Sequence, residues 1–516
     1  MLINVPADMF GLIFQYEKKD ELTEESCRLQ VEKYIELLTA CHPKVILLNV
    51  SYRRSFIKSD VMATPLYDVE IDANGNPIMD ENGAVIKHFT PVPAETNNKY
   101  GDVVNKYVDA MKITHRHLLE RNIDIFDMAV SAIKRAGCEV WFSLRMSDHH
   151  VFDGLSTEFI DKNCFAKSPV DAGRLDCSLK PVQTYFKHYI QELVSNYDID
   201  GIELDWLRTL PILPADKRKD YTILSEYMKE LHDVVSSSGS NKHLAIRVLP
   251  EISGSLGNGM DVARWIADGS VDRVTLENFY IPTNFEISID EWRNAIQEKN
   301  VNKNAYELYC GTDNGVSCTD RFYHYMTPEL IRGFASTHIG RGADDVYLFN
   351  LCELTGAPTE MFSEKEGKKV GCVEERLRAA TQLDNGCRRY LYVRGKDNRY
   401  PIKLEPGEKK EIKIYTGKAS SEYAVFIGSD EAWDLEITMN DSELSKLEQV
   451  KNYKDFEYKE ERPKWIPLYY RGEFDKSMRC GKATSETVIL DGYNTFVLKN
   501  TDCKPIEISW IEVEVN

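Results

Sequence analysis

The stretch DGIELDWLR, residues 200–208, decides the fold because it has the pattern of a short β-strand with two chemically different faces. Side chains along a strand point to opposite faces in turn, so Glu203 and Asp205 share one face. The other face carries Ile202, Leu204 and Trp206. The apolar face suits contact with helices, and the acidic face then points into the interior of a barrel. We expect Asp205 near the mouth of that barrel and Glu203 deeper inside it.

The rest of the first 382 residues alternates strands with helices. Apolar runs typical of buried parallel strands occur at residues 10–16, 44–50, 138–144, 243–249, 271–278, 305–310 and 344–350. Apolar residues spaced by three or four predict helices at 24–40, 122–136, 180–196, 220–235, 259–268, 288–298, 327–338 and 371–382. Eight strand–helix repeats predict an α/β fold, the (β/α)8 TIM barrel. The alternative, an open doubly wound sheet, requires a glycine-rich phosphate loop after the first strand, and the sequence has none.

Two further parts of the chain are predicted outside the barrel repeats. An insertion at about 58–105 contains Asn-Gly pairs at 74–75 and 82–83, which are typical of tight β-hairpin turns. It follows the second strand, so it is either a lid or subsite wall at the mouth of the barrel or a passive decoration. From residue 385 to residue 516, extended segments alternate apolar and polar residues between turns, which predicts a jelly-roll-like β-sandwich after a barrel domain of residues 1–384.

Composition excludes several classes of partner. The formal net charge of −19 argues against a nucleic-acid partner, and the chain lacks the run of ~20 apolar residues that membrane insertion needs. None of the 12 cysteines forms a CxxC pair, which favours free thiols in a reducing compartment. The first residues lack the features of a signal peptide, so we expect a cytoplasmic protein, or a secreted or periplasmic one if such a peptide has been removed. The oligomeric state is left open.

Polar residues stand at the ends of nearly all predicted strands, where TIM barrels place their active sites. The candidates for substrate binding are Arg53, Arg145, His149, Glu203, Trp206, Arg208, Arg247, Asn278, Tyr280, Tyr309, Asp313 and Asn350. The three aromatic residues among them could stack on sugar rings, although packing in the core is the alternative for each. The arginines raise the possibility of an anionic sugar such as a uronate or a sulfate ester.

Three carboxylates at strand ends are candidates for catalysis. Hydrolysis of a glycosidic bond needs one carboxyl group as acid and another as nucleophile or base. Asp205 and Glu251 end the adjacent strands four and five, and Glu277 ends strand six. The structural alternatives are an ion-pair network with arginines for Asp205 and Glu277, and a loop-surface position for Glu251.

No cofactor or metal site is predicted. The run Asp148-His149-His150 contains two potential metal ligands side by side. Adjacent histidines on an extended segment point in opposite directions, so they make a poor chelate.

A family resemblance accompanies these observations. The segments NVSYRRSF (49–56), WFSLRMSDHH (141–150) and DGIELDWLR, followed by RWIADGSVDRVTLENFY (264–280), resemble the glycosyl-hydrolase-like family 10 barrel proteins. The resemblance covers nearly all of the barrel. It implies a barrel with an appended β-sandwich and a role connected with glycans, without fixing the substrate.

The same strand is similar to two other groups of glycoside hydrolases. In the family 18 pattern DxxDxDxE, residues Asp200, Glu203 and Asp205 fill the first three acidic positions, and Leu207 stands in place of the catalytic glutamate. Substrate-assisted chemistry of the chitinase type is therefore not expected. The strand positions of Asp205 and Glu251 are similar to those of the nucleophile and acid in the α-amylase superfamily, although the flanking motifs differ.

The sequence thus leads to a hypothesis with two rivals. We expect a glycoside hydrolase acting on an oligo- or polysaccharide, with Asp205 as nucleophile or base, Glu251 as general acid and Glu277 as substitute for either. One rival is a carbohydrate-binding barrel without catalysis. The other is a barrel enzyme of another type, such as a lyase or a metal-dependent hydrolase, whose activity a chelator would abolish.

Overall fold

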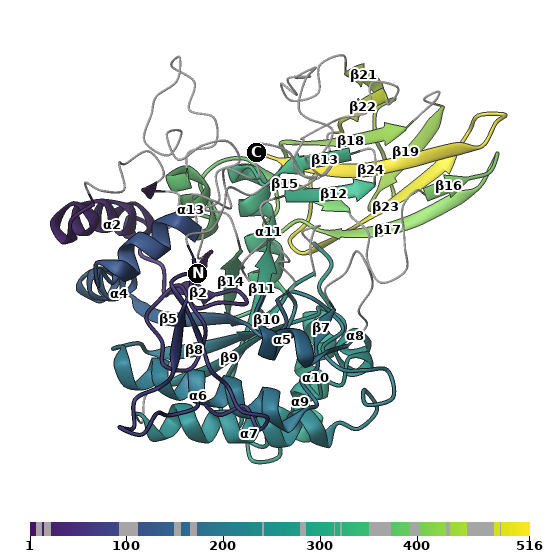
Figure 1. Cartoon of the computed structure of the whole chain (residues 1–516). Helices are drawn as coiled ribbons and strands as arrows, with labels where there is room; N and C mark the ends of the chain where they lie inside the picture. The colour runs from purple at the N-terminus through teal and green to yellow at the C-terminus, as the bar shows by residue number, and fades with distance from the viewer. Residues whose placement is uncertain are drawn as a thin grey trace.

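The computed structural model contains a closed eight-stranded parallel barrel followed by antiparallel sheets (Figure 1). The structure describes residues 1–6, 13–14, 22–91, 112–148, 156–165, 173–239, 242–278, 285–313, 315–319, 322–349, 373–392, 402–429, 434–450, 479–485 and 487–516. This arrangement is the TIM barrel with an appended β-sandwich that the sequence predicts. The boundary between residues 384 and 385 stays a prediction.

The barrel closes in the order β1-β14-β11-β10-β9-β8-β5-β2. Its strands, in chain order, are β1 (Leu2–Val5), β2 (Val45–Ser51), β5 (Glu139–Arg145), β8 (Gly201–Asp205), β9 (His243–Val248), β10 (Arg273–Leu276), β11 (Glu307–Thr312) and β14 (Asp345–Leu348). Each neighbouring pair is parallel, so all strands enter at one end of the barrel and leave at the other. The site can therefore be sought at one end, where the strands finish.

Seven of the predicted strands are confirmed, and the first is wrong. The barrel begins with the four buried residues of β1, LINV, and not with residues 10–16. Within that predicted run, Ile13 has helical backbone geometry and Phe14 lies in a turn. A short apolar run cannot by itself distinguish a strand from a buried helix, and here the longer run gave the wrong answer.

Helices cover the outside of the barrel as predicted. They include α2 (Glu24–Thr39), α4 (Ile125–Arg135), α6 (Lys180–Asn196), α7 (Thr222–Ser237), α9 (Val262–Ala267), α10 (Ile289–Lys299), α11 (Pro328–Gly340) and α13 (Val373–Thr381). A capping box fixes the start of α2, where Thr23 and Ser26 bond to each other's backbone N–H groups. Prolines occupy the first turns of α6 and α11. Backbone N–H groups in the first turn have no partner within the helix, so the N–H group that proline lacks is not missed there.

The alternation of side chains along each strand divides the barrel into an outer and an inner layer. The outward residues, such as Ile202 and Leu204 on β8 and Trp206 directly after it, belong to the large core shared with the helices. A separate buried cluster lies inside the barrel and consists of Leu2, Val45, Leu47, Trp141, Ala245, Tyr309, Tyr347 and Phe349. The face assignment predicted for residues 200–208 is therefore the one that the structure shows.

The described part of the insertion after β2, residues 58–91, contains an extended ribbon that packs on the side of the barrel. Strands β3 (Tyr67–Val69) and β4 (Lys87–Phe89) pair antiparallel, and glycines with positive φ occupy both Asn-Gly turns. Asn76 bonds His188 on α6 at 3.0 Å, and the Asp60 backbone N–H donates to Glu192 on the same helix. These contacts place the ribbon against the outer face of α6, which favours the decoration over the lid.

Two antiparallel sheets follow the barrel. The larger has the order β15-β24-β18-β22-β21, with β16 also paired to β24, and the smaller has the order β17-β23-β19-β20. The strands are β15 (Arg388–Tyr392), β16 (Ile402–Leu404), β17 (Lys409–Tyr415), β18 (Tyr423–Ser429), β19 (Leu435–Met439), β20 (Ser442–Glu443), β21 (Glu448–Val450), β22 (Arg479–Ala483), β23 (Tyr493–Asn500) and β24 (Ile506–Val515). Buried Arg389 binds both carboxylate oxygens of buried Glu512 and so ties β15 to β24.

Two sequence expectations outside the fold itself can also be compared with the structure. Eight cysteines in the described ranges are free thiols, and four of these eight are buried: Cys27, Cys138, Cys177 and Cys310. Among the described residues, no helix has both the length and the apolar character required to cross a bilayer.

Helix α11 joins the barrel to the sheets through a close backbone contact. A Cβ atom on Gly333 would lie 1.9 Å from the carbonyl oxygen of Arg389 on β15. Hydrogen bonds on both sides support the contact, since Arg332 donates to the Cys387 carbonyl and Ser336 bonds the Tyr390 hydroxyl. The absence of a side chain at residue 333 is what allows this approach.

We predict that Gly333→Ala lowers the free energy of unfolding by about 1–3 kcal/mol, because the added methyl group pushes β15 away from α11. Gly257→Ala is the matched control, since residue 257 ends the short helix α8 (Ile252–Gly257) and nothing lies near its Cβ position. The control should be neutral or slightly stabilising, as alanine favours helix. Urea denaturation of both variants tests this, and equal stabilities would contradict it.

Candidate active site

The interior of the barrel changes from apolar to polar along its axis. Near the strand starts it is filled by residues such as Leu2, Val45 and Trp141. Farther along, the inward positions carry buried polar side chains, which are Asn4, Asn49, Ser143, Arg145, Glu203, Asp205, Arg247, Thr275 and Glu277. Burial of so many polar groups costs free energy unless they bind one another or a ligand. The polar half is therefore the candidate site.

Arg247 on β9 organises this polar half. Its Nη1 donates to Asp205 Oδ2 on one neighbouring strand, and its Nε donates to Glu277 Oε2 on the other, both at 2.8 Å. The guanidinium group also lies over the ring of Phe349, 3.7 Å from the centroid. One cation thus holds two carboxylates on different edges of its plane, and all three groups are almost fully buried.

Glu203 lies deeper on β8 and is bound across the barrel. Its Oε1 accepts hydrogen bonds from Ser143 Oγ at 2.7 Å and from the Tyr347 hydroxyl at 2.8 Å. Within the described residues, its Oε2 has no hydrogen-bond partner. Burial, followed by the nearby charge of Asp205, raises the pKa of Glu203 from 4.5 to about 8. The side chain is therefore largely a neutral acid at pH 7, with Oε2 as the place for its proton.

Glu277 has a raised pKa, and its carboxylate lies in a space that a glycine on the neighbouring strand leaves open. Burial raises the pKa of this carboxyl group to about 7, although the ion pair with Arg247 opposes the shift. Its Oε1 has no hydrogen-bond partner among the described residues. A Cβ atom on Gly311 of β11 would lie 2.3 Å from Glu277 Oε2, so the missing side chain at residue 311 makes room for the carboxylate.

The structure brings some of the predicted residues together and places others apart. Asp205, Glu277, Arg247 and Glu203 form one buried group, and the charge of half-exposed Asp313 contributes to the raised pKa of Glu277. Glu251 is the N-cap residue of α8, and its carboxylate lies over the first turn of that helix, with Oε2 3.8 Å from the Cβ position of Gly254. Asn278 and Arg208 are partly buried at the ends of their strands.

Two of the predicted substrate-binding arginines bind protein groups. The guanidinium of Arg53 donates to the carbonyls of Asp148 and Gly173 and to the Ser156 hydroxyl, which ties loops together. Arg145 lies over the ring of Tyr52 at 4.0 Å and forms an ion pair with Asp148.

Trp206 and Tyr309 do not line the mouth of the barrel. Trp206 is fully buried in the core shared with the helices. The Tyr309 hydroxyl donates to the carboxylate of Glu307, which begins β11 at the opposite end of the barrel. Both residues therefore take the core-packing alternative that the sequence left open.

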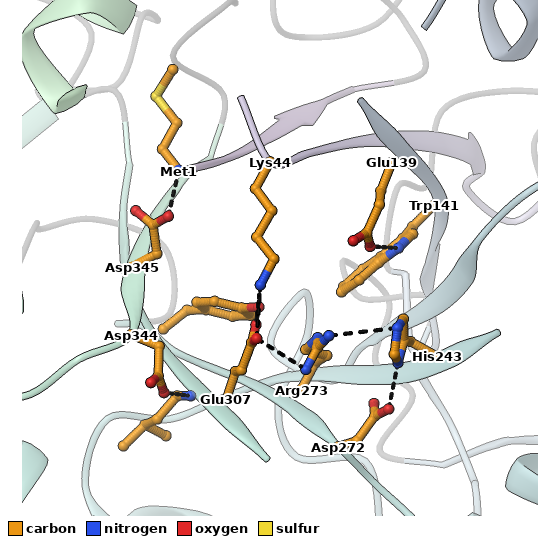
Figure 2. A network of polar contacts seen from close by, with 12 residues as sticks. Met1, Lys44, Glu139, Trp141, His243, Asp272, Arg273, Glu307, Asp344 and Asp345 are labelled. Atoms are coloured by element: carbon orange, nitrogen blue, oxygen red, sulfur yellow. Dashed lines mark hydrogen bonds and ion pairs between the residues drawn. The ribbon is translucent and has the colours of Figure 1, made fainter. Parts of the chain in front are cut away.

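Figure 2 shows the charged network at that opposite end, where the strands begin. Glu307 accepts from Lys44 and forms an ion pair with Arg273, while His243 bonds Asp272. Charges at this end of a TIM barrel serve stability. This charged network at the strand starts is therefore distinct from the candidate site at the strand ends.

Three of the predicted residues, His149, Tyr280 and Asn350, lie outside the described residues. Sequence reasoning also missed inward-facing residues of the barrel, among them Asn4, Asn49, Ser143, Tyr347 and Phe349. Period-two alternation from a correctly placed strand would have found each of them, because they share a face with Leu2, Leu47, Trp141 or one another.

Comparisons with known proteins were made for the whole chain. No protein-family model matches it, and no curated protein matches it. Similar solved structures include an endo-1,4-beta-mannanase from Rhizomucor miehei, with 11% identity, a TM-score of 0.39 and coverage of 74% of this chain and 92% of that chain. The alpha-L-fucosidase AlfC from Lactobacillus casei has 14% identity, a TM-score of 0.32 and coverage of 74% and 94%.

Amy13B from Eubacterium rectale has 10% identity, a TM-score of 0.40 and coverage of 97% of this chain and 95% of that chain. At such low identities and TM-scores, the activities of these proteins cannot be transferred to this chain.

We predict that the stability of the protein falls as the pH rises from about 4.5 to about 8, in part because of Glu203. The folded state keeps the Glu203 proton throughout this range, whereas the unfolded chain releases it near pH 4.5. Glu203→Gln resembles the neutral acid and should reduce this pH dependence, which thermal unfolding at pH 5 to 9 measures. Glu226→Gln, at an exposed position of α7, is the control and should leave it unchanged. An unaltered slope in Glu203→Gln would contradict the assignment.

Proposed function

We propose that the protein is a glycoside hydrolase whose two catalytic carboxylates are Asp205 and Glu277. The observation that carries the proposal is the pair of bonds from Arg247, which hold these carboxylates on different edges of one guanidinium group. Glycoside hydrolases need two carboxyl groups about 5 to 9.5 Å apart, with one protonated and the other ionised. A carboxylate pair arranged around one cation at the strand ends of a TIM barrel fits this requirement.

The surroundings of the two groups divide the roles between them. Asp205 accepts hydrogen bonds from Arg247 and from the backbone N–H of Leu207, which are both donors that suit an ionised nucleophile or base. Glu277 has a pKa raised to about 7 and an oxygen, Oε1, that can carry the proton. Glu277 is therefore the general acid of the proposal.

Glu251 takes no part in this proposal. Its carboxylate lies over the first turn of α8, whereas Glu277 shares a guanidinium with Asp205. The general acid is thus moved from strand five, where the sequence led us to expect it, to strand six.

We further propose a neutral sugar as the substrate. Arg247 and Arg145 are paired with carboxylates, and Arg53 donates to backbone carbonyls and a hydroxyl. Because these arginines already have partners in the protein, they no longer favour a uronate or a sulfate ester as the substrate.

We predict that Asp205→Asn and Glu277→Gln each lower kcat/KM by a factor of about 10² to 10⁴, the range for loss of a catalytic acid or base. Chromogenic aryl glycosides of neutral hexoses, in both anomeric forms, provide the assay. Glu251→Gln is the matched control because residue 251 follows the neighbouring strand β9 as the N-cap of α8, and this variant should keep its activity within a few-fold. A large loss in the control together with an active Glu277→Gln variant would return the acid role to Glu251.

We also predict that kcat/KM of the wild-type protein falls as the pH rises above about 7. A general acid must hold its proton in the free enzyme, and Glu277 loses it near that pH. The pH–rate profile of hydrolysis measures this directly. A profile that stays flat from pH 6 to 9 would argue against Glu277 as the acid.

A further inference from the structure

A cleft between helices on the outside of the barrel has no role in the proposed hydrolysis. Its volume is about 370 Å³, and three segments that are far apart in the sequence line it. They are the first residues of the insertion after β2, the start of α4 and the last turns of α6. We call this space the α4–α6 cleft. Its volume lies in the range of about 300 to 1,000 Å³ that is usual for small-ligand sites.

The lining of the α4–α6 cleft is strongly acidic. It contains four carboxylates and one ammonium group, which belong to Asp60, Asp124, Asp127, Glu192 and Lys58. A second ammonium group, from a lysine at residue 87 outside the lining, forms an ion pair with Asp60. Four carboxylates less two cations leave a net charge of −2 around the cleft. A hollow with this excess of negative charge attracts cations.

Asp124 is partly buried in this lining and is held by neutral donors. Its Oδ1 caps α4 by accepting from the backbone N–H groups of Phe126 and Asp127, both at 3.0 Å. Its Oδ2 accepts from the hydroxyl of Tyr197, which follows α6. Burial raises the pKa of Asp124 in spite of these bonds. A cation beside this carboxylate would offset the cost of its burial.

Glu192 is in the same situation on the other wall. It accepts from the backbone N–H of Asp60 at 2.6 Å and from the Ser59 hydroxyl. Burial raises the pKa of this carboxyl group as well. Within the described residues, neither Glu192 nor Asp124 forms an ion pair. Two carboxylates on opposite walls of an open cleft thus lack a directly bound cation.

A smaller cavity adjoins the α4–α6 cleft and is mainly apolar. Its volume is about 160 Å³, and Lys58 and Asp124 line both spaces. Its apolar lining residues are Phe56, Ile57, Leu118, Leu119, Ile123 and Ile125. The combined space therefore offers a negatively charged part and an apolar part side by side. This combination suits a ligand that carries ammonium groups on a hydrocarbon chain.

We propose that the α4–α6 cleft binds an aliphatic diamine. Two ammonium groups match the net charge of −2, and each of them can donate to several of the carboxylate oxygens of Asp124, Asp127 and Glu192. The methylene chain lies against the adjoining apolar cavity. A metal ion is a poorer match, because no group of three or more potential ligand side chains among the described residues is arranged to hold one. The proposal is independent of the proposed hydrolysis.

The main test places a cation in the cleft through Asn196→Arg. Residue 196 is exposed, ends α6 and lines the cleft, so the new guanidinium group both fills the space and offsets its charge. We expect the affinity for 1,5-diaminopentane, measured by calorimetry, to fall by about tenfold or more. Ser195→Arg is the matched control, because it adds the same charge to the same turn of α6 at an exposed position outside the lining. The control should bind the diamine within about twofold of the wild type.

A second variant removes one negative charge and leaves the space open. Asp127→Asn alters an exposed carboxylate of the lining and should weaken diamine binding about two- to fivefold, the range for an exposed ion pair. Glu226→Gln, exposed on α7 and outside the lining, changes the net charge equally and should have no effect. Equal losses in the two variants would overturn the proposal, because the diamine would then respond only to the total charge of the protein.

Two comparison compounds separate a site from general attraction to an acidic protein. At constant ionic strength, 1,5-diaminopentane should raise Tm, whereas the neutral analogue 1,5-pentanediol and magnesium chloride should not. The proposal is overturned if the diamine does not bind, if magnesium raises Tm as much, or if Asn196→Arg and Ser195→Arg weaken binding equally. No glycan enters these measurements, so failure of the proposed hydrolysis would leave their result unchanged.

Discussion

The candidate site depends on how three carboxylates are accommodated inside one small barrel. Glu203, Asp205 and Glu277 are all buried, and ionised carboxylates so close together would repel one another strongly. Arg247 offsets two of these charges with direct bonds, and Glu203 meets the same constraint by keeping its proton. One arginine and one retained proton thus make the polar half of the barrel compatible with folding. Burial raises the pKa of Glu277 in spite of its ion pair with Arg247, and the raised pKa suits this carboxyl group to acid catalysis.

The two ends of the barrel differ in how their charged side chains are paired. At the strand starts, Lys44 and Arg273 both contact Glu307, so cations and anions are matched close to solvent. At the strand ends, carboxylates outnumber their cationic partners and several polar atoms have no partner in the described structure. Matched ion pairs are therefore concentrated at one end of the barrel and unmatched carboxylates at the other, with the apolar inner cluster between them.

The sequence alone predicted the barrel because its signals are strong and repeated. Seven strand positions and the two faces of β8 followed from period-two patterns, and they located Asp205 and Glu277 correctly at strand ends. The ion-pair network that the sequence offered as the alternative for Asp205 and Glu277 is present, with Arg247 as its cation. The detailed geometry of its contacts could not be predicted, because contact between residues 205, 247 and 277 depends on the barrel register. Asn4 was missed for a more specific reason: the run LINV is short, and the apolar run at 10–16 appeared the better strand. The role predicted for Glu251 stays a prediction, because a position at a strand end does not tell where the side chain points.

The glycine at residue 311 has a consequence for how this site can change over evolutionary time. Its bare Cα leaves space for the Glu277 carboxylate, so the two positions, far apart in sequence, are coupled through sterics. A side chain at residue 311 can be accommodated only after residue 277 has been replaced by a smaller residue. If residue 311 changed first, the new side chain would displace the Glu277 carboxylate. Loss of the acidic group would therefore open the way to filling the space and make its recovery difficult. In a related protein that has lost the carboxylate at position 277, we therefore expect a residue larger than glycine at position 311.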